Sequence, residues 1–157
     1  MYGIDTFSWG KLIYLKNNNY EGLILEIIKK GNFFITHEVN EEFEYRFANE
    51  INLLNYITLY PQIEIDFKKY KWSGFDAADA SLLEYNKIEA NIIITEDHLM
   101  LAESITNRRN IIQLADYFGL LLEKEFLDRR EFYHIIKLLR KLRNITERKE
   151  KELMDLR

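Results

Sequence analysis

Short runs of consecutive apolar residues alternate along this chain with longer stretches in which apolar residues recur every three or four positions. The short runs predict buried strands, and the longer stretches predict amphipathic helices. Strands are predicted at 1–4, 33–36, 63–67, 91–95 and 111–112. Helices are predicted at 6–16, 20–28, 37–58, 75–89 and 98–106, and the pattern is helical from 114 almost to the end. Such alternation is typical of an α/β layer fold with a mainly parallel sheet.

Individual residues mark where some of these elements begin and end. Thr36 is placed to cap the helix that follows it, and Pro61 ends the helical stretch at 37–58, which can be one helix or two. The stretch 91–95 contains three consecutive isoleucines and predicts a strand buried on both faces. Residues 63–67 alternate apolar and acidic side chains, which predicts a strand with one face in water.

Composition narrows the class of protein. Hydrophobic residues make up 47% and charged residues 31% of the 157 residues, so the chain can bury a core as one domain. It contains no Cys, which excludes a disulfide scaffold, a cysteine nucleophile and zinc sites built from thiolates. No apolar run approaches the ~20 residues of a membrane helix, and we expect a cytoplasmic protein with no membrane partner.

The formal charge of −4 conceals an uneven distribution along the chain. Residues 1–128 hold 12 basic and 21 acidic side chains, whereas residues 129–151 hold 9 basic and 3 acidic ones. The acidic body and the basic C-terminal segment therefore need separate explanations.

Three acidic residues stand where the predicted elements would deliver them to one edge of the sheet. Asp5 follows the first strand, Asp97 follows the strand at 91–95, and Asp79 lies early in the helix before that strand. Open parallel sheets form their sites at this edge. Each acid also has a simpler explanation, as a helix cap, a turn residue or a partner of a helix dipole. Together, however, converging carboxylates repel one another, and Mg²⁺ or Mn²⁺ would neutralise them through oxygen ligands.

Further carboxylates lie nearby in the sequence. Asp76 precedes Asp79 by one helical turn and is either an extra ligand or a capping-box partner of Ser73. The helical stretch at 37–58 offers three competing acids, Glu38, Glu41 and Glu42. Such a cluster suits phosphodiester hydrolysis, because one ion can activate water while a second stabilises the leaving oxygen.

Four short motifs follow one another along the chain: Ile4-Asp5-Thr6-Phe7-Ser8, Ile35-Thr36-x-x-Val39-x-x-Glu42, Asp79-Ala80-Ser81-Leu82-Leu83 and Ile94-Thr95-Glu96-Asp97-His98-Leu99. In this order and spacing the chain resembles the PIN-domain ribonucleases, a family that includes the VapC-like toxins of prokaryotic toxin–antitoxin pairs. The 18-residue step from Asp79 to Asp97, ending in Thr-x-Asp, is the most specific part. The resemblance covers residues 1–118 and implies a PIN-like three-layer α/β/α catalytic domain, with a helical C-terminal extension at 119–157.

The resemblance also implies roles for individual residues. The carboxylates that hold one or two divalent cations in the family correspond to Asp5, Glu42, Asp79 and Asp97. Thr95 corresponds to a hydroxyl that helps to order the catalytic site, with Thr6 or Ser8 assisting near Asp5. From the residues alone, Thr95 is equally well explained as a cap or turn residue, and Glu38 or Glu41 could take the place of Glu42.

The basic C-terminal segment offers a second functional surface. Lys137 and Lys141 lie on a helical stripe beside the apolar face of residues 132–142, and Arg140 and Arg143 widen this stripe. The stripe is a solvated helix face, a surface that contacts RNA phosphates, or a helix that docks a second copy or a partner protein.

Two tryptophans and three histidines are also conspicuous. Trp9 and Trp72 are expected in the core, although Trp72 in a loop near the site could stack a base. No metal-ligand spacing connects the histidines, of which only His98, beside Asp97, would contact phosphate or carry a proton; the three are His37, His98 and His134.

These observations predict a divalent-metal-dependent endoribonuclease with Mg²⁺ or Mn²⁺ as its cofactor and RNA as its substrate. The resemblance adds an antitoxin protein as a partner. A homodimer is the expected assembly, because Leu153, Met154 and Leu156 extend the apolar character of the C-terminal helical part into the tail. The alternative is a non-catalytic interaction module of the same fold, which would bind RNA or a protein through the basic C-terminal helix.

Overall fold

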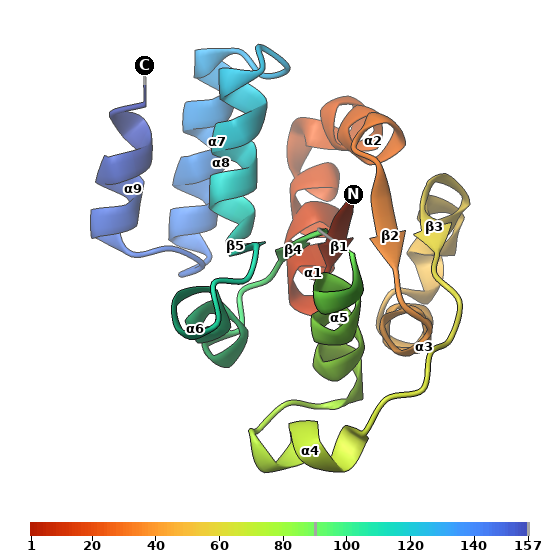
Figure 1. The fold of residues 1–157 in the computed structure, drawn as a ribbon. Helices are drawn as coiled ribbons and strands as arrows, with labels where there is room; N and C mark the ends of the chain where they lie inside the picture. Colours follow the sequence, from red (N-terminus) through yellow and green to blue (C-terminus); the bar gives the residue numbers. More distant parts are fainter. Residues whose placement is uncertain (90, 157) are drawn as a thin grey trace. The chain divides into compact units, whose positions relative to one another are not determined.

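A computed structural model describes residues 1–89 and 91–156 (Figure 1). The chain divides into two compact units, a first unit at 1–112 and a second unit at 113–157. The sequence places the end of the first domain at residue 118, which is an internal residue of helix α7 (Leu114–Glu123), whereas the division in the structure lies between residues 112 and 113. Because the backbone hydrogen bonds of a helix tie its successive turns together, a boundary is expected at its end rather than inside it.

All strand pairings described in the first unit are parallel, in the order β3-β2-β1-β4-β5. The strands are β1 (Tyr2–Ile4), β2 (Phe33–Ile35), β3 (Thr58–Leu59), β4 (Ile92–Ile94) and β5 (Ile111–Ile112). The chain moves outward from β1 to β3 and then returns to β4 on the other side of β1. The carboxyl ends of β1 and β4 therefore form the topological switch point, where sheets of this kind place their sites.

Helices connect the successive strands of the first unit (Figure 1). They are α1 (Thr6–Leu15), α2 (Glu21–Lys30), α3 (His37–Arg46), α4 (Phe67–Trp72), α5 (Ala77–Ile88) and α6 (His98–Thr106). A kinked segment, Lys16–Tyr20 (η1), joins α1 to α2, and a 3₁₀ helix, Ala48–Tyr56 (η2), follows α3. The predicted α/β class with a parallel sheet is confirmed, and the arrangement is compatible with three α/β/α layers.

The helix predicted at 37–58 is two helices, and both end before Pro61. Thr36 caps the first of them as predicted, because its side chain accepts a hydrogen bond from the backbone N–H of Val39. Phe47 breaks the α-helical backbone at the junction, with φ −127° and ψ 43°.

The strand predicted at 63–67 is wrong. The outer strand is β3, which pairs Thr58 with Phe34 and Leu59 with Ile35, and Phe67 already belongs to helix α4. Asp66, read from the sequence as a water-facing strand residue, caps α4 by accepting the backbone N–H of Lys69. Alternation in a short segment cannot decide between a strand and a loop that leads into a capped helix.

The central strand β1 lies very close to its neighbours. A Cβ added to Gly3 would lie 2.5 Å from the Phe34 ring and 2.9 Å from Ile93, so this position has no room for a side chain. Trp9 is fully buried, as predicted, and its ring meets Phe43 edge to face at 5.4 Å. The prediction that Trp72 lies in the core is wrong, because its side chain at the end of α4 is 92% exposed.

The second unit consists, over its described residues, of α7, α8 (Arg129–Lys141) and α9 (Glu147–Met154). The apolar stripe predicted on α8 is buried at its four helical positions, Phe132, Ile135, Ile136 and Leu139. In this unit a Cβ on Gly119 would lie 3.1 Å from Leu156 and 3.6 Å from Leu153, so α7 and the C-terminal segment pack closely. None of the described helices is long and apolar enough to cross a membrane.

Candidate active site

Asp5 is the most deeply held acid at the switch point. It directly follows β1, is 4% exposed, and caps α1 by accepting the backbone N–H of Ser8 at 2.7 Å. Its other oxygen accepts the Thr95 hydroxyl at 2.5 Å and the backbone N–H of Glu96 at 3.2 Å. Burial raises the pKa of this carboxyl, against the lowering effect of these hydrogen bonds. Asp5 therefore acts as a helix cap and also joins the ends of β1 and β4.

Thr95 links the two predicted acids that follow β1 and β4. Its hydroxyl is fully buried, donates to Asp5 and accepts the backbone N–H of Asp97 at 3.0 Å. Asp97 in turn caps α6, because one of its oxygens accepts the N–H groups of Leu99 and Met100 at 2.8 and 2.9 Å. The Thr-x-Asp sequence thus forms a hydrogen-bonded turn that leaves one oxygen of Asp97 outside the cap.

Asp79 differs from the other two acids in its lack of partners. It lies in the first turn of α5, is half-buried, and its carboxylate has no hydrogen-bond or ion-pair partner among the described residues. Burial, followed by the negative charges of Asp76, Asp97 and Asp5, raises the pKa of Asp79 to about 7. The structure therefore brings the predicted acids Asp5, Asp79 and Asp97 close enough for their charges to interact.

Asp76 caps α5 itself, by accepting the backbone N–H of Asp79 at 2.9 Å. The predicted capping box with Ser73 is wrong, because Ser73 ends the preceding helix α4. The cap position belongs to the last residue with extended backbone before the helix, which is Asp76 with φ −80° and ψ −174°.

Of the three competing acids on α3, Glu42 reaches the start of α1. Its carboxylate accepts the hydroxyl of Thr6 at 2.6 Å, one residue after Asp5. Glu41 instead lies 3.8 Å from the imidazole of His37 on its own helix. Glu42 is thus adjacent to Asp5 in the structure, although it is not among the charges that raise the pKa of Asp79.

No group of three or more Asp, Glu or His side chains within residues 1–89 and 91–156 stands ready to hold a metal ion. Both oxygens of Asp5 and one oxygen of Asp97 already accept protein donors. One observation nevertheless fits a cation, because the carboxylates that approach one another here offer only oxygen as a ligand atom.

An exposed aromatic side chain lies at the edge of this site and was not identified from the sequence. Phe7 follows Asp5 by two residues, is 63% exposed, and its ring centre lies 5.6 Å from the guanidinium carbon of Arg46. Phe7 lies outside the apolar stripe of α1 formed by Trp9, Leu12 and Ile13, and this spacing could have indicated its exposure from the sequence. His98, the other neighbour of the acids, is exposed at the first position of α6.

The predicted RNA contacts lie on and just after α8 of the second unit. Lys137, Lys141 and Arg143 are exposed. Arg140 is engaged within the unit, since its guanidinium lies 3.7 Å from Glu150 and donates to the carbonyl of Ile145. The stripe therefore has three exposed cations and one that stabilises the packing of the unit.

Comparisons of the chain with protein-family models, with curated proteins and with solved structures found no match. The functional argument accordingly rests on the geometry of the site.

Proposed function

We propose that this chain is a divalent-metal-dependent endoribonuclease that hydrolyses RNA phosphodiester bonds at the edge formed by β1 and β4. The observation that carries the proposal is the approach of Asp5, Asp79 and Asp97 from three separate elements at the switch point of a parallel sheet. Unpaired like charges at such an edge destabilise the fold, and a bound cation removes that penalty. The resemblance of the four sequence motifs to PIN-domain ribonucleases supports the same proposal.

The residues that would hold Mg²⁺ or Mn²⁺ are Asp79, the free oxygen of Asp97 and Asp5, with Glu42 beside them. A divalent cation in such a site polarises a phosphoryl oxygen and lowers the pKa of bound water. The chain's own contribution is positioning. Thr95 fixes the orientation of the Asp5 carboxylate through its 2.5 Å hydrogen bond, and Thr6 holds Glu42 toward Asp5. Phe7 presents an exposed ring on which an RNA base can stack.

Cleavage of a labelled single-stranded RNA by the full chain in Mg²⁺ or Mn²⁺ tests the proposal. Asp79→Asn is the sharpest variant, because the carboxylate has no partner to lose among residues 1–89 and 91–156 and an amide keeps its size. We expect it to lower the cleavage rate by at least about 100-fold. Asp97→Asn should act similarly, since Asn can still cap α6.

Asp66→Asn is the matched control, because Asp66 also lies at the start of a helix but outside the site. Its cleavage rate should equal that of the wild type, and melting curves establish that all variants fold. Undiminished cleavage by Asp79→Asn, or by the wild type in excess chelator, would overturn the proposal.

A second candidate function is a non-catalytic module that binds RNA or a protein. The use of both Asp5 oxygens in protein hydrogen bonds favours it, because such a carboxylate is already satisfied without a cation. Metal binding separates the two functions. The nuclease should bind Mn²⁺ saturably, and Asp79→Asn should abolish this binding. The non-catalytic module should bind its partner equally well in chelator.

The PIN-domain resemblance extends the proposal to a toxin with an antitoxin partner, and the apolar residues of the C-terminal tail extend it to a homodimer. Only the sequence supports these two points. The mass of the purified chain in solution tests the dimer. Co-purification with the product of an adjacent short reading frame tests the antitoxin.

A further inference from the structure

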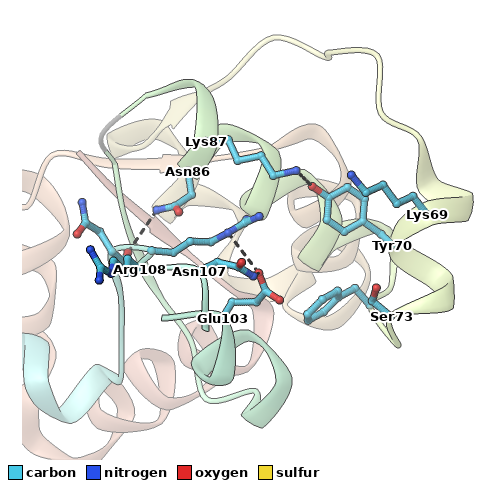
Figure 2. A pocket seen from close by; sticks show the side chains of 11 residues that line it. Lys69, Tyr70, Ser73, Asn86, Lys87, Glu103, Asn107 and Arg108 are labelled. Carbon is cyan, nitrogen blue, oxygen red and sulfur yellow. Dashed lines mark hydrogen bonds and ion pairs between the residues drawn. The ribbon is translucent and has the colours of Figure 1, made fainter. Parts of the chain in front are cut away.

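A basic pocket of about 620 Å³ lies in the first unit, away from the strand ends that carry the acids (Figure 2). It is formed by α4, by the C-terminal parts of α5 and α6, and by the loop between α6 and β5. Its charged lining residues are four cations and one acid, namely Lys69, Lys87, Arg108, Arg109 and Glu103. This excess is unusual in its surroundings, because residues 1–112 hold 17 acidic and 11 basic side chains.

Two of the four cations are paired. Arg109 lies 3.3 Å from Glu103 and donates to the carbonyl of Leu83, and Lys87 lies 2.5 Å from Glu84 and also donates to the Tyr70 hydroxyl. These contacts hold the two side chains in place, and a dashed line in Figure 2 marks the hydrogen bond between Lys87 and Tyr70. The side chains of Arg109 and Lys87 therefore have fixed positions in the lining of the pocket.

The other two cations are exposed and have no hydrogen-bond or ion-pair partner among the described residues, and they are Lys69 on α4 and Arg108 after α6. Figure 2 shows them at opposite ends of the pocket. The acid that lines the pocket, Glu103, is already bound by Arg109 and by the side-chain amide of Asn107 at 2.8 Å. The pocket thus keeps a surplus of positive charge that an anionic ligand can neutralise.

We propose that this pocket binds the phosphodiester backbone of single-stranded RNA and holds the strand whose cleavage is proposed at the acidic edge. The inference rests on that proposed function. Helix α5 contributes to both the acidic edge and the pocket. Asp79 near its start and Lys87 near its end are separated by about 12 Å along the helix axis. The acids repel RNA, so affinity has to come from cations at a distance from them.

Asn86, Asn107 and Ser73 also line the pocket. The amide nitrogens of Asn86 and Asn107 already donate within the protein, and their amide oxygens can accept from sugar hydroxyls and base edges. Its volume is in the range of sites that hold a molecule of nucleotide size. Charge at both ends and amides between them suit a strand with several phosphates better than a single free phosphate.

Binding of a fluorescent single-stranded RNA to the full chain in excess chelator tests the inference without cleavage. The pocket variant combines Lys69→Ala with Arg108→Asn, because Asn tolerates the left-handed backbone of Arg108, whose φ is 53°. We expect weaker binding and a smaller salt dependence, with the logarithmic slope reduced by about 0.7 for each cation removed.

Two controls match this variant. Lys68→Ala removes a neighbouring exposed lysine of α4 that does not line the pocket, and it should leave binding unchanged. Lys137→Ala with Lys141→Ala removes two exposed cations from α8 and has the same effect on net charge. A loss confined to the pocket variant supports the inference, and an equal or larger loss in the α8 variant overturns it.

Two further arms separate this inference from the proposed cleavage. If the wild type cleaves RNA and the pocket variant keeps the same KM and the same binding, the pocket inference fails while the nuclease stands. If no RNA is cleaved but binding is lost only in the pocket variant, the strand site stands and the nuclease fails. Adenosine monophosphate as competitor identifies the ligand, because displacement of the RNA at equal or lower concentration would show a mononucleotide site and overturn the inference.

Discussion

The two ends of helix α5 carry opposite charges, and the surroundings of these two charges differ. At the first turn, the Asp79 carboxylate has no hydrogen-bond or ion-pair partner within the described part of the chain, and burial together with nearby carboxylates raises its pKa. At the last turn, Lys87 is paired with Glu84 and bonded to the Tyr70 hydroxyl. The helix dipole favours acids at the first end and bases at the second, so it explains the sign of each charge. It does not explain why acids from two other elements gather around Asp79.

This difference separates charges that stabilise the fold from charges that cost it stability. Lys87 pairs with Glu84 and donates to the Tyr70 hydroxyl, so its removal loses both contacts. The Asp79 carboxylate bonds to no group in the described chain, and its removal relieves the repulsion from the neighbouring carboxylates. A group that the fold tolerates at a cost is a stronger indication of a ligand site than a group that the fold needs.

The largest expected effect concerns Asp5, which accepts hydrogen bonds from Ser8, Thr95 and Glu96 and so is the most heavily bonded of the three approaching acids. Asp5→Ala removes the cap of α1 and leaves the hydroxyl of Thr95 and the N–H of Glu96 without their acceptor. We expect a loss of about 3 kcal/mol in the free energy of unfolding, measured in urea. Asp5→Asn should lose less, since Asn still accepts at the cap. A loss below about 1 kcal/mol for Asp5→Ala would contradict the structural role.

Added Mg²⁺ or Mn²⁺ should raise the melting temperature of the wild type. The stabilisation is about 2.7 kcal/mol when the ion is at one hundred times its dissociation constant. Asp79→Asn should abolish this shift, whereas the pocket variant with Lys69→Ala and Arg108→Asn should keep it. Equal shifts in all three proteins would mean that the ion binds elsewhere.

The stability of the protein in chelator should fall as the pH rises from about 4 to about 7. In the folded state Asp79 keeps its proton up to a pKa of about 7, whereas its ordinary pKa is 3.8, so the folded state holds the extra proton in this window. Asp79→Asn removes that part of the pH dependence. At about pH 8 the variant should melt higher than the wild type, by about 2–4 °C for each kcal/mol relieved.

Below about pH 3.5 both proteins have a neutral side chain at position 79, and their melting temperatures should converge. Asp66→Asn serves as the control, because it lacks the neighbouring acids. A variant that melts below the wild type at pH 8 would show that Asp79 stabilises the fold instead.

The smallest effects are expected in the basic pocket. Lys69→Ala should change the free energy of unfolding by no more than about 0.5 kcal/mol, because the side chain is exposed and has no partner among the described residues. Lys87→Ala should cost up to about 1 kcal/mol through its contacts with Glu84 and Tyr70. Urea denaturation of the two variants checks the difference, and the reverse order would contradict it.

The positions of the acids could be predicted because they depend on local rules. Apolar runs define β1 and β4, and the residues that follow parallel strands meet at one edge, as Asp5 and Asp97 do. The orientation of their oxygens could not be predicted. It depends on the buried hydroxyl of Thr95, which is 90 residues from Asp5 in the sequence.

The errors share a physical cause, which is competition between local patterns and contacts made by the whole fold. Residues 63–67 alternate like a strand, but β2 already pairs with Thr58 and Leu59. Trp72 is apolar enough for a core, yet α4 is only six residues long and leaves this side chain outside. The basic pocket was missed because three separate segments supply its four cations, and no single segment looks basic enough to suggest it.

The outer strand β3 has a consequence for the behaviour of this protein at high concentration. A strand at the edge of a sheet can pair with the same edge of another molecule and start aggregation. Here the strand is two residues long, and Pro61, two positions after Leu59, has no N–H with which to continue a ladder. The exposed side chain of Leu59 thus lies on an edge too short to template a second chain. The same proline that ends a local pattern also protects the molecule against self-association.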